Sequence, residues 1–411
     1  MAQDRMVIAG GGLAGATAAK TLRTEGFTGP ISLIAAEDHV PYIRPPLSKE
    51  FLLGKAGEES VLVVPAGWYR DNDVELVLGS RAVAIEPADH MVRLSDDRRL
   101  HYAKLLLATG AQPRSIPIPG AGLDGVMTFR TLADSLRLQS LLKDGGRQVV
   151  MIGSGWIGME LASAARTYGN DVTLIGLEDI PLSAAIGPEL GSYFQQIHTA
   201  RGVKFVLPAS AASVEGRDGR ASAVRTTTGQ TLPADIVIVA VGVVPDTSLA
   251  ETAQLAVRNG ILVDAGLHTN APDVLAAGDV ANALHPFTGE HHRSEHWANA
   301  LNGGKVAAKS MLGQDATLDV VPYFYTDQFD VSMEYSGFPS LASGVAPTIR
   351  GSLDEGSFIA FWLRDGAVVA GMNVNQHRVQ KPIKALISGR LHVDVTSLTD
   401  PDVPLESLLP S

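Results

Sequence analysis

Two glycine-rich motifs stand where a phosphate-bearing ligand could be held. The first, Gly10–Gly15 (GGGLAG), follows the apolar run Met6–Ala9, and the second, Gly153–Gly158 (GSGWIG), follows the apolar run Gln148–Ile152. In a G-x-G-x-x-G motif the first glycine makes a tight turn, and the second lets the backbone approach a pyrophosphate. The third lets the helix pack closely on the strand, so that the helix N-terminus faces the negative charge. Because each motif lies between a strand and a helical stretch, both predict dinucleotide binding.

Each motif opens a βαβ unit. In the first unit we expect a helix over Ala16–Glu25 and a strand over Ile31–Ala35. In the second we expect a helix over Met159–Tyr168 and a strand over Val172–Ile175. Glu37 follows the first unit's second strand, where an acidic residue typically binds a ribose hydroxyl. Two such units suggest two dinucleotides, and a pair of FAD and NAD(P)H would allow hydride transfer where the domains meet.

The remaining segments predict the domain plan. Leu76–Ile85 and Met91–Leu94 look like strands of an antiparallel excursion. After about Val320, short alternating segments indicate an antiparallel sheet, and Gln376–Ser388 contains a closing helix. We therefore expect an α/β fold with two Rossmann-like dinucleotide-binding domains, for FAD and NAD(P)H, and a smaller α+β C-terminal domain. The predicted limits are 1–112 and 242–320 for the FAD-binding domain, 113–241 for the NAD(P)H-binding domain and 321–411 for the C-terminal domain.

The composition narrows the chemistry. The 411 residues carry a formal net charge of -11, which disfavours nucleic acid as a partner. There is no cysteine, which removes disulfide exchange, thiolate nucleophiles and cysteine-held zinc or iron–sulfur clusters. His285, His291 and His292 lack clear ligand spacing and are expected in a loop, so no metal site is predicted. The longest apolar run, Ile236–Val244, is too short to span a bilayer, and we expect a cytoplasmic enzyme that makes no membrane contact.

A longer stretch, Pro41–Lys49 (PYIRPPLSK), resembles the P-Y-x-R-P-P-L-S-K stretch of the FAD-dependent, putidaredoxin reductase-like ferredoxin reductases. These serve Rieske-type dioxygenases and haem-thiolate monooxygenases. Further matches are Ala108–Arg114, Ala277–Val280, Arg293–Trp297 and Pro322–Gln328, so the resemblance covers nearly the whole chain. The proline-rich and Asp-Gln motifs are fairly specific to this family, whereas the glycine and Gly-Asp motifs occur in a wider class of flavoenzymes.

The resemblance implies roles around the flavin. Lys49 and Glu160 form a pair close to the hydride-accepting nitrogen and are the candidate catalytic residues. Arg44 approaches the flavin side of the cofactor, Asp279 hydrogen-bonds the ribityl chain, and Trp297 lies beside the isoalloxazine. Structural interpretations stay open for three of them: Arg44 as a surface residue, Glu160 as a solvated carboxylate at a helix start, and Trp297 as a packing residue.

The other predicted cofactor-binding residues lie in or beside the same motifs. The resemblance implies that Gly10, Gly12, Gly15 and Glu37 hold the adenosine half of FAD. Trp156 resembles an aromatic residue of related flavoenzymes that covers the flavin until nicotinamide displaces it; the alternative is a packing residue under the helix start. The full set is Gly10, Gly12, Leu13, Ala14, Gly15, Glu37, Ala108, Thr109, Gly110, Arg130, Gly153, Gly155, Trp156, Ile157, Gly158, Glu178, Gly242 and Gly278.

The nicotinamide side departs from the resembled family. Those proteins usually carry Glu or Asp at the end of the strand after the second motif, but here the strand ends in Gly176. The following loop contains no arginine for a 2′-phosphate, and Glu178 and Asp179 would repel one. Glu178 could instead reach the ribose, because a glycine lets the loop shift. We therefore expect NADH to be preferred over NADPH.

Without cysteines, electrons must leave the flavin directly, and a one-electron carrier is the natural acceptor. We expect a ferredoxin reductase that feeds an oxygenase, with a [2Fe–2S] ferredoxin favoured over rubredoxin. An NAD(P)H oxidase or diaphorase without a protein acceptor is an alternative, as is a redox-sensing protein resembling apoptosis-inducing factor. Because the chain is acidic, docking of an acidic ferredoxin needs a local positive patch. The candidates are Arg293, Arg378, Lys381, Lys384 and Arg390.

Overall fold

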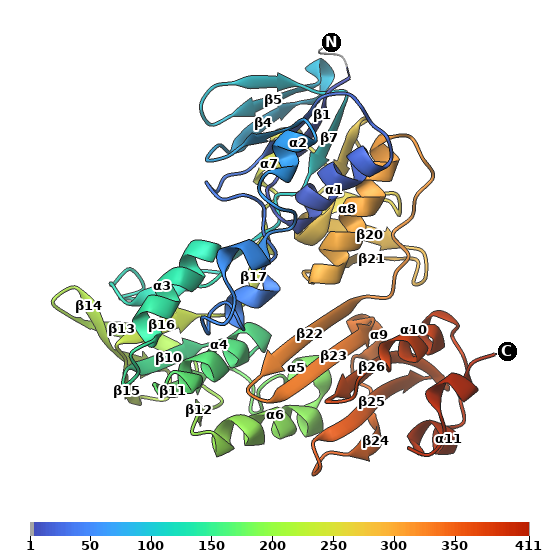
Figure 1. The fold of residues 1–411 in the computed structure, drawn as a ribbon. Helices are drawn as coiled ribbons and strands as arrows, with labels where there is room; N and C mark the ends of the chain where they lie inside the picture. Colours follow the sequence, from blue (N-terminus) through green and yellow to red (C-terminus); the bar gives the residue numbers. More distant parts are fainter. Residues whose placement is uncertain (1–3, 411) are drawn as a thin grey trace. The chain divides into compact units, whose positions relative to one another are not determined.

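The computed structural model describes residues 4–410, which form two compact units (Figure 1). The first unit contains residues 4–44, 57–112 and 244–322, and the second contains residues 45–56, 113–243 and 323–410. The domain limits expected from the sequence stay a prediction. One grouping differs from them, because residues 45–56 belong to the second unit and not with the rest of 1–112.

The first unit is built on a five-stranded parallel sheet. Residues Met6–Ala9 and Ile31–Ile34 in this sheet are wholly buried and, apart from Ser32, apolar, as expected for parallel strands that are covered on both faces. Helices α1 (Leu13–Thr24) and α8 (Trp297–Met311) pack against each other beside this sheet. The strand order is β19 (Val274–Ala276), β7 (Lys104–Leu107), β1 (Met6–Ala9), β2 (Ile31–Ile34) and β3 (Val74–Val77).

Two sequence expectations for the first unit were wrong. The single strand expected over Leu76–Ile85 is divided, because Gly79 adopts a positive φ of 64° in a turn between β3 and β4 (Ala82–Glu86). Strand β3 therefore joins the parallel sheet, whereas β4 pairs with β5 (Met91–Leu94) in an antiparallel sheet that β6 (Arg99–His101) completes. His285, His291 and His292 lie in strands and not in a loop. His291 and His292 lie in β21 (Glu290–Arg293), which pairs with β20 (Ala281–His285), and β20 also pairs with β18 (Ile261–Val263).

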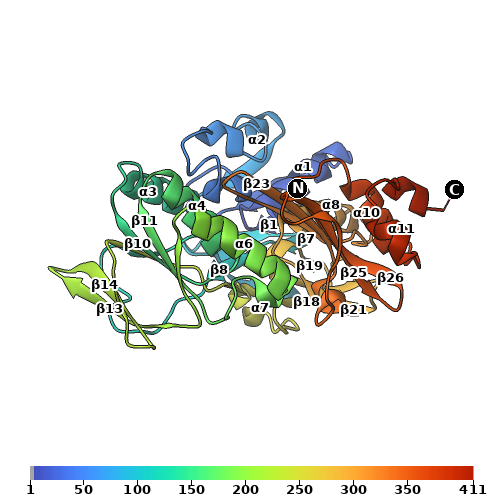
Figure 2. The same ribbon diagram turned by 90° about the horizontal axis from the view of Figure 1, so that it is seen from below.

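The second unit repeats the same plan around its own glycine motif. Its parallel sheet has the order β12 (Lys204–Val206), β11 (Asp171–Ile175), β10 (Gln148–Ile152), β16 (Ile236–Val239) and β9 (Val126–Thr128). Its main helices are α3 (Leu132–Leu142), α4 (Trp156–Thr167) and α6 (Pro188–Ala200). A three-stranded antiparallel ribbon extends away from this sheet (Figures 1 and 2), and it comprises β13 (Ala211–Arg217), β14 (Arg220–Thr226) and β15 (Thr231–Pro233).

The C-terminal part of the second unit is an antiparallel sheet with helix α10 (Gln380–Ser388) packed on it, which confirms the predicted α+β arrangement. One apolar core joins it to the nucleotide-binding part, with Met159 of α4 and Phe194 of α6 in the same cluster as Met333 and Phe358. No helix among residues 4–410 is long and apolar enough to cross a membrane. The sheet order is β22 (Tyr323–Gln328), β23 (Val331–Gly337), β26 (Ala367–Val374), β25 (Ser357–Arg364) and β24 (Thr348–Ser352).

Residues 45–56 are tied to the second unit by side chains that bind their backbone. Ser135 Oγ donates to the carbonyl oxygen of Leu47 at 2.7 Å, and Tyr168 Oη donates to that of Leu52 at 2.8 Å. Gln139 Nε2 donates to the carbonyl oxygens of both Phe51 and Leu52. The Leu52 side chain is itself fully buried in the core of this unit. The proline-rich motif therefore crosses from the first unit, which holds its first four residues, into the second.

Candidate functional site

The outer glycines of both motifs are required by the packing of the protein itself. A Cβ on Gly10 or Gly153 would stand 2.0 or 2.2 Å from a backbone carbonyl oxygen, and φ at these residues is +136° and +116°. A Cβ on Gly15 or Gly158 would stand 2.1 or 2.2 Å from the carbonyl oxygen of the first glycine of its own motif. These contacts fix the tight turn and the close approach of helix to strand, whether or not a ligand binds.

The middle glycines behave differently. A Cβ on Gly12 would meet only Nη1 of Arg44, at 3.5 Å, and a Cβ on Gly155 would meet nothing within 4 Å. The protein's packing does not need a glycine at either position, so the missing side chain leaves space for a ligand. Helices α1 and α4 also lack side-chain caps and acidic residues in their first turns, whereas α3 is capped by Thr131. An open glycine beside an uncapped helix N-terminus suits a pyrophosphate, and the chain has two such cradles.

The predicted residues around the first cradle are in contact. Glu37 accepts hydrogen bonds from Tyr42 Oη at 2.6 Å and from Arg44 Nη2 at 3.2 Å. Because Arg44 also approaches Gly12, its guanidinium lies at the motif, where a phosphate would be neutralised. Gly278, which precedes Asp279, adopts a φ of +78°, and a Cβ there would lie 3.0 Å from the side chain of Ala14. The structure thus brings the first motif together with Glu37, Arg44 and the Gly-Asp motif.

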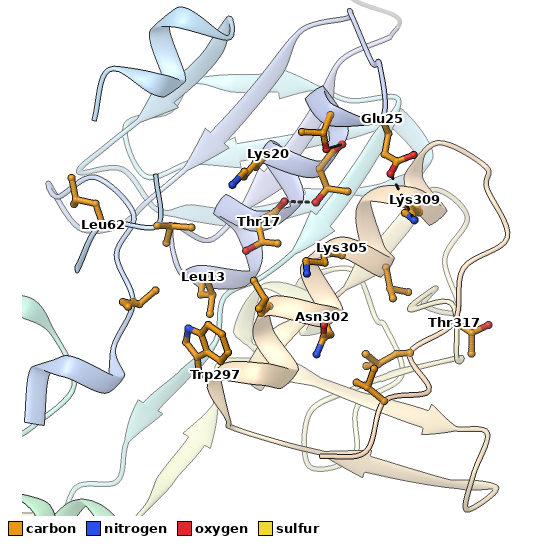
Figure 3. A pocket seen from close by; sticks show the side chains of 18 residues that line it. Leu13, Thr17, Lys20, Glu25, Leu62, Trp297, Asn302, Lys305, Lys309 and Thr317 are labelled. Carbon is orange, nitrogen blue, oxygen red and sulfur yellow. Dashed lines mark hydrogen bonds and ion pairs between the residues drawn. The ribbon is translucent and has the colours of Figure 1, made fainter. Parts of the chain in front are cut away.

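Trp297 carries a buried polar atom that the protein does not satisfy. Its indole Nε1 is buried and has no hydrogen-bond partner among residues 4–410. A buried N–H without an acceptor costs free energy, so this atom is suited to a ligand acceptor. Trp297 begins α8, close to Leu13 at the start of α1 (Figure 3). The Ala108–Gly110 segment, at the end of β7, is held by a hydrogen bond from Thr109 Oγ1 to the carbonyl oxygen of Asp246 at 2.7 Å.

A groove of about 660 Å³ runs between α1 and α8 in the first unit (Figure 3). Leu13 and Trp297 line one part of it, and Lys20, Lys305 and Lys309 contribute its positive charge. Lys309 pairs with Glu25 at 3.7 Å, whereas Lys20 and Lys305 are exposed and have no ion-pair partner among the described residues. This groove therefore carries uncompensated positive charge on a chain that is acidic as a whole.

Around the second cradle, Trp156 is packed under the start of α4. Its ring makes edge contacts with Phe194 and Phe324, with ring centroids 5.7 and 5.4 Å away. The gate role of Trp156 stays a prediction. The neighbouring Ile157 is exposed, and Gly242 follows β16 with a φ of +93°. Arg130 lies just before α3, where its backbone N–H donates to the carboxylate of Asp134 at 3.0 Å.

At the position where resembled proteins carry an acid, any side chain would have to displace its neighbours. A Cβ on Gly176 would stand 2.2 Å from Ser154 Oγ and 2.9 Å from Cδ2 of Leu207. Glu178 is also committed locally, since its Oε2 accepts from Ser183 Oγ at 2.8 Å and from the backbone N–H of Ala184 at 3.2 Å. These bonds hold the Glu178 carboxylate at the start of the short helix α5 (Ser183–Ile186). A reach by Glu178 to the ribose stays a prediction.

Lys49 and Glu160 form a buried ion pair in the second unit. Lys49 Nζ lies 2.8 Å from Glu160 Oε2, and the side chains are only 7% and 3% exposed. The alternative for Glu160, a solvated carboxylate at a helix start, is therefore wrong. Ser48 Oγ donates to the same oxygen at 2.5 Å, and Thr326 Oγ1 donates to Oε1 at 2.6 Å. Lys49 Nζ also lies 3.3 Å from the carbonyl oxygen of Pro45. A buried ion pair persists only when its remaining hydrogen-bonding capacity is satisfied in this way.

Comparisons with known proteins identify the family of the chain. Residues 4–304 match the pyridine nucleotide-disulphide oxidoreductase family, and residues 323–409 match the reductase C-terminal family. The ferredoxin--NAD(+) reductase component of the anthranilate 1,2-dioxygenase system of Burkholderia cepacia is 38% identical, with all of both chains covered. Rhodocoxin reductase of Rhodococcus erythropolis is 34% identical over 98% of this chain and 93% of its own.

Solved structures give the same result. The ferredoxin reductase for the CYP199A2 system from Rhodopseudomonas palustris matches with a TM-score of 0.94 and 32% identity, over 99% of this chain and 100% of that one. The covalent putidaredoxin reductase–putidaredoxin complex matches with a TM-score of 0.95 and 31% identity, over 99% and 98%. The chain belongs to the pyridine nucleotide-disulphide oxidoreductase family, among its ferredoxin reductases.

Membership explains why there are two cradles, because FAD and a pyridine nucleotide are the cofactors of this family. The family name also refers to disulfide chemistry, but this oxidoreductase has no cysteine with which to perform it. Residue-by-residue cofactor contacts remain predictions. The sequence did not reveal the residues that satisfy Glu160. Ser48 and Thr326 stand inside motifs of the family, but nothing in those motifs shows that both donate to one carboxylate.

Because the outer glycine Gly10 is required for packing and the middle glycine Gly12 is not, substituting each should have a different effect. Gly10→Ala should lower the free energy of unfolding of the cofactor-free protein by about 1–3 kcal/mol, because it forces a strained backbone and a clash with a carbonyl group. Gly12→Ala should leave that free energy unchanged but weaken FAD affinity about tenfold, since its methyl group enters the cradle only. Thermal unfolding and fluorescence titration with FAD measure the two effects. Equal destabilisation by both variants, or native FAD affinity in Gly12→Ala, would contradict this assignment.

The ion pair predicts a kinetic effect. Lys49→Met should slow flavin reduction by NADH by at least about tenfold, because a fixed positive charge no longer stabilises negative charge on the reduced cofactor. Lys55→Met is the matched control, since Lys55 lies in the same segment but is exposed. Anaerobic stopped-flow absorbance gives the rate constant. An unchanged rate in Lys49→Met with FAD retained would refute the role of this lysine.

Proposed function

We propose that this oxidoreductase transfers electrons from NADH, through FAD, to a [2Fe–2S] ferredoxin that feeds an oxygenase. The observation that carries the proposal is the presence of two ligand-open glycine cradles in a chain with no cysteine. Bound FAD can accept a hydride from a pyridine nucleotide and release single electrons, so no protein thiol is needed between donor and acceptor. The names of the relatives, which include a dioxygenase component and a reductase captured with putidaredoxin, support a ferredoxin as acceptor.

In this proposal, one set of residues binds the cofactor and another provides electrostatic stabilisation. Arg44 and the uncapped N-terminus of α1 hold the phosphates at the first cradle, while the Trp297 N–H offers a donor to the cofactor. Lys49 supplies a fixed positive charge, and Glu160 keeps the ammonium group in place. Burial of this pair makes its electrostatic effect larger than it would be in water.

The function is tested with purified protein prepared without denaturants. We expect one FAD per chain, and rapid NADH-dependent reduction of an added [2Fe–2S] ferredoxin with slow turnover on oxygen alone. Turnover on oxygen that equals or exceeds turnover on ferredoxin would instead favour an oxidase or diaphorase. Slow reoxidation together with a change in oligomeric state on adding NADH would favour a redox-sensing protein.

The choice of nicotinamide cofactor is a separate prediction. We expect higher kcat/KM with NADH than with NADPH, because Glu178 and Asp179 place negative charge in the loop where a 2′-phosphate would lie. The preference should be modest, since Gly176 presents no carboxylate to the adenosine ribose. Steady-state kinetics with both cofactors measures it. A higher kcat/KM with NADPH would show that a basic residue outside this loop completes the site.

Docking of an acidic ferredoxin fits the α1/α8 groove better than the position named first from the sequence. Arg293 is only 11% exposed and pairs with Glu295 at 2.7 Å, so its charge is compensated. Lys384, on α10, lies with its ammonium group 4.1 Å from the ring centroid of Tyr323. Lys20 and Lys305 are exposed and have no ion pair among the described residues, so their charge is available for a partner.

Charge reversal tests this surface. Lys305→Glu should raise the KM for ferredoxin about tenfold at low salt, because it replaces attraction with repulsion at the groove. Reduction of ferricyanide by NADH should not change, since a small acceptor needs no docking surface. Lys55→Glu makes the same charge change at an exposed lysine of the other unit and serves as control. Equal effects of Lys305→Glu on both acceptors, or equal effects of the two variants, would count against the groove.

A further inference from the structure

A chain of buried side chains leads from Glu160 to a histidine that no part of the proposed function uses. Thr326 Oγ1 lies 2.6 Å from Glu160 Oε1, and Gln328 Nε2 lies 3.2 Å from Thr326 Oγ1. His198 Nε2 lies 2.9 Å from Gln328 Oε1. Every side chain in this series is buried, and His198 and Gln328 are completely so. The series joins three elements of the second unit, α4, β22 and α6.

The directions of the hydrogen bonds in this series are fixed by the ionised carboxylate of Glu160. Glu160, the ionic partner of Lys49, can only accept, so Thr326 must donate its hydroxyl proton to Oε1. The oxygen of Thr326 is then an acceptor toward Gln328, which must present its amide N–H₂ group. The amide oxygen of Gln328 consequently faces His198, and His198 must carry its proton on Nε2. All donors point toward the carboxylate.

The surroundings of His198 favour the tautomer that this order needs. Its ring lies among aromatic side chains, with Phe329 at 5.0 Å and Phe205 at 6.4 Å between ring centroids. Nδ1 is buried and has no hydrogen-bond partner among the described residues. Burial lowers the pKa of His198 to about 4, and the hydrogen bond to Gln328 opposes that shift, while the charge of Arg201 adds to it. Near neutral pH the imidazole therefore carries one proton, and only Nε2 has an acceptor for it.

We propose that Thr326, Gln328 and His198 are positioning residues that orient the Glu160 carboxylate and, through it, the ammonium group of Lys49. The proposal rests on the proposed function, because it assigns these residues to the flavin-reduction step. Thr326 occupies Oε1, so Oε2 is left to Ser48 and Lys49. Gln328 keeps the Thr326 proton directed at Glu160 by occupying the oxygen lone pair, and His198 keeps the Gln328 amide from turning over.

A purely structural interpretation is that this hydrogen-bonded series only stabilises the packing of β22 on α4 and α6. The two interpretations differ in what they predict for the rate of flavin reduction in folded protein. A packing role affects the free energy of unfolding and leaves the rate of native molecules alone. Positioning affects the rate and acts only while Glu160 can receive the hydrogen bond.

The residue of the series that contacts Glu160 is tested with Thr326→Val, which keeps the side-chain shape and removes the hydroxyl. In the FAD-loaded protein, this variant should slow flavin reduction at saturating NADH about tenfold, in line with loss of one oriented donor. Thr326→Ser should restore most of the rate. Thr231→Val is the matched control, because Thr231 is exposed on β15 of the same unit. A rate in Thr326→Val equal to that of the control would overturn the proposal.

The far end of this series is tested with His198→Leu and His198→Gln, since a glutamine amide can present an N–H where the imidazole does. We expect about a threefold loss with Leu and a smaller loss with Gln, because the donor to Gln328 is removed in one and retained in the other. Equal rates of flavin reduction in these two folded variants would contradict the positioning role of His198.

A second background separates positioning from folding. With Glu160→Gln as the parent protein, adding Thr326→Val should produce no further loss of rate, because the carboxylate that Thr326 orients is already gone. A further tenfold loss there would overturn the proposal. If the unmodified protein itself is not reduced by NADH, the proposed function fails first; normal reduction with unaffected Thr326 and His198 variants would reject the positioning role alone.

Discussion

The second unit is organised around the cost of burying the Lys49–Glu160 ion pair. Removing two charges from water is expensive, and their attraction offsets that cost only when other hydrogen bonds complete the site. Here the groups come from all three stretches of the unit: Ser48 and Lys49 from 45–56, Glu160 from the nucleotide-binding part, and Thr326 from the C-terminal part. The C-terminal sheet is therefore more than an appendage, because its first strand supplies one of the groups that hold the carboxylate.

The same requirement explains why residues 45–56 leave the first unit. A lysine on a free loop would stay hydrated, whereas this segment is held by Ser135, Gln139 and Tyr168 through its backbone and by Leu52 through the core. The motif that begins at Tyr42 and Arg44, beside the first cradle, thus ends at the ion pair. One short stretch of chain therefore supplies Arg44 to the first unit and Lys49 to the second.

Sequence reasoning succeeded where the signal was local. The βαβ units around the two motifs were placed to within a few residues, because a strand, a glycine turn and a helix follow one another directly. It failed over Leu76–Ile85, where one apolar run hides a turn at Gly79. The resemblance implied the pairing of Lys49 with Glu160, and the structure brings these two residues together.

The supporting contacts had no such signal. Thr326 lies 166 positions from Glu160, and Gln328 lies 130 positions from His198, so neither spacing nor periodicity relates them. Gly176 is a similar case, because only the packed structure shows that Ser154 and Leu207 fill the space an acidic side chain would need. Residues that hold a charged group in place are selected by three-dimensional contact, and the sequence shows them only as ordinary buried polar residues.

The central role of the buried pair is tested most directly by a double-mutant cycle on Lys49 and Glu160, read as the rate constant for flavin reduction in anaerobic stopped flow. If Glu160 acts by holding Lys49, then Lys49→Met and the double variant Lys49→Met with Glu160→Gln should be equally slow, because the carboxylate has nothing left to orient. Losses that multiply in the double variant would show that the two residues act independently, and would contradict the idea that the pair works as one unit.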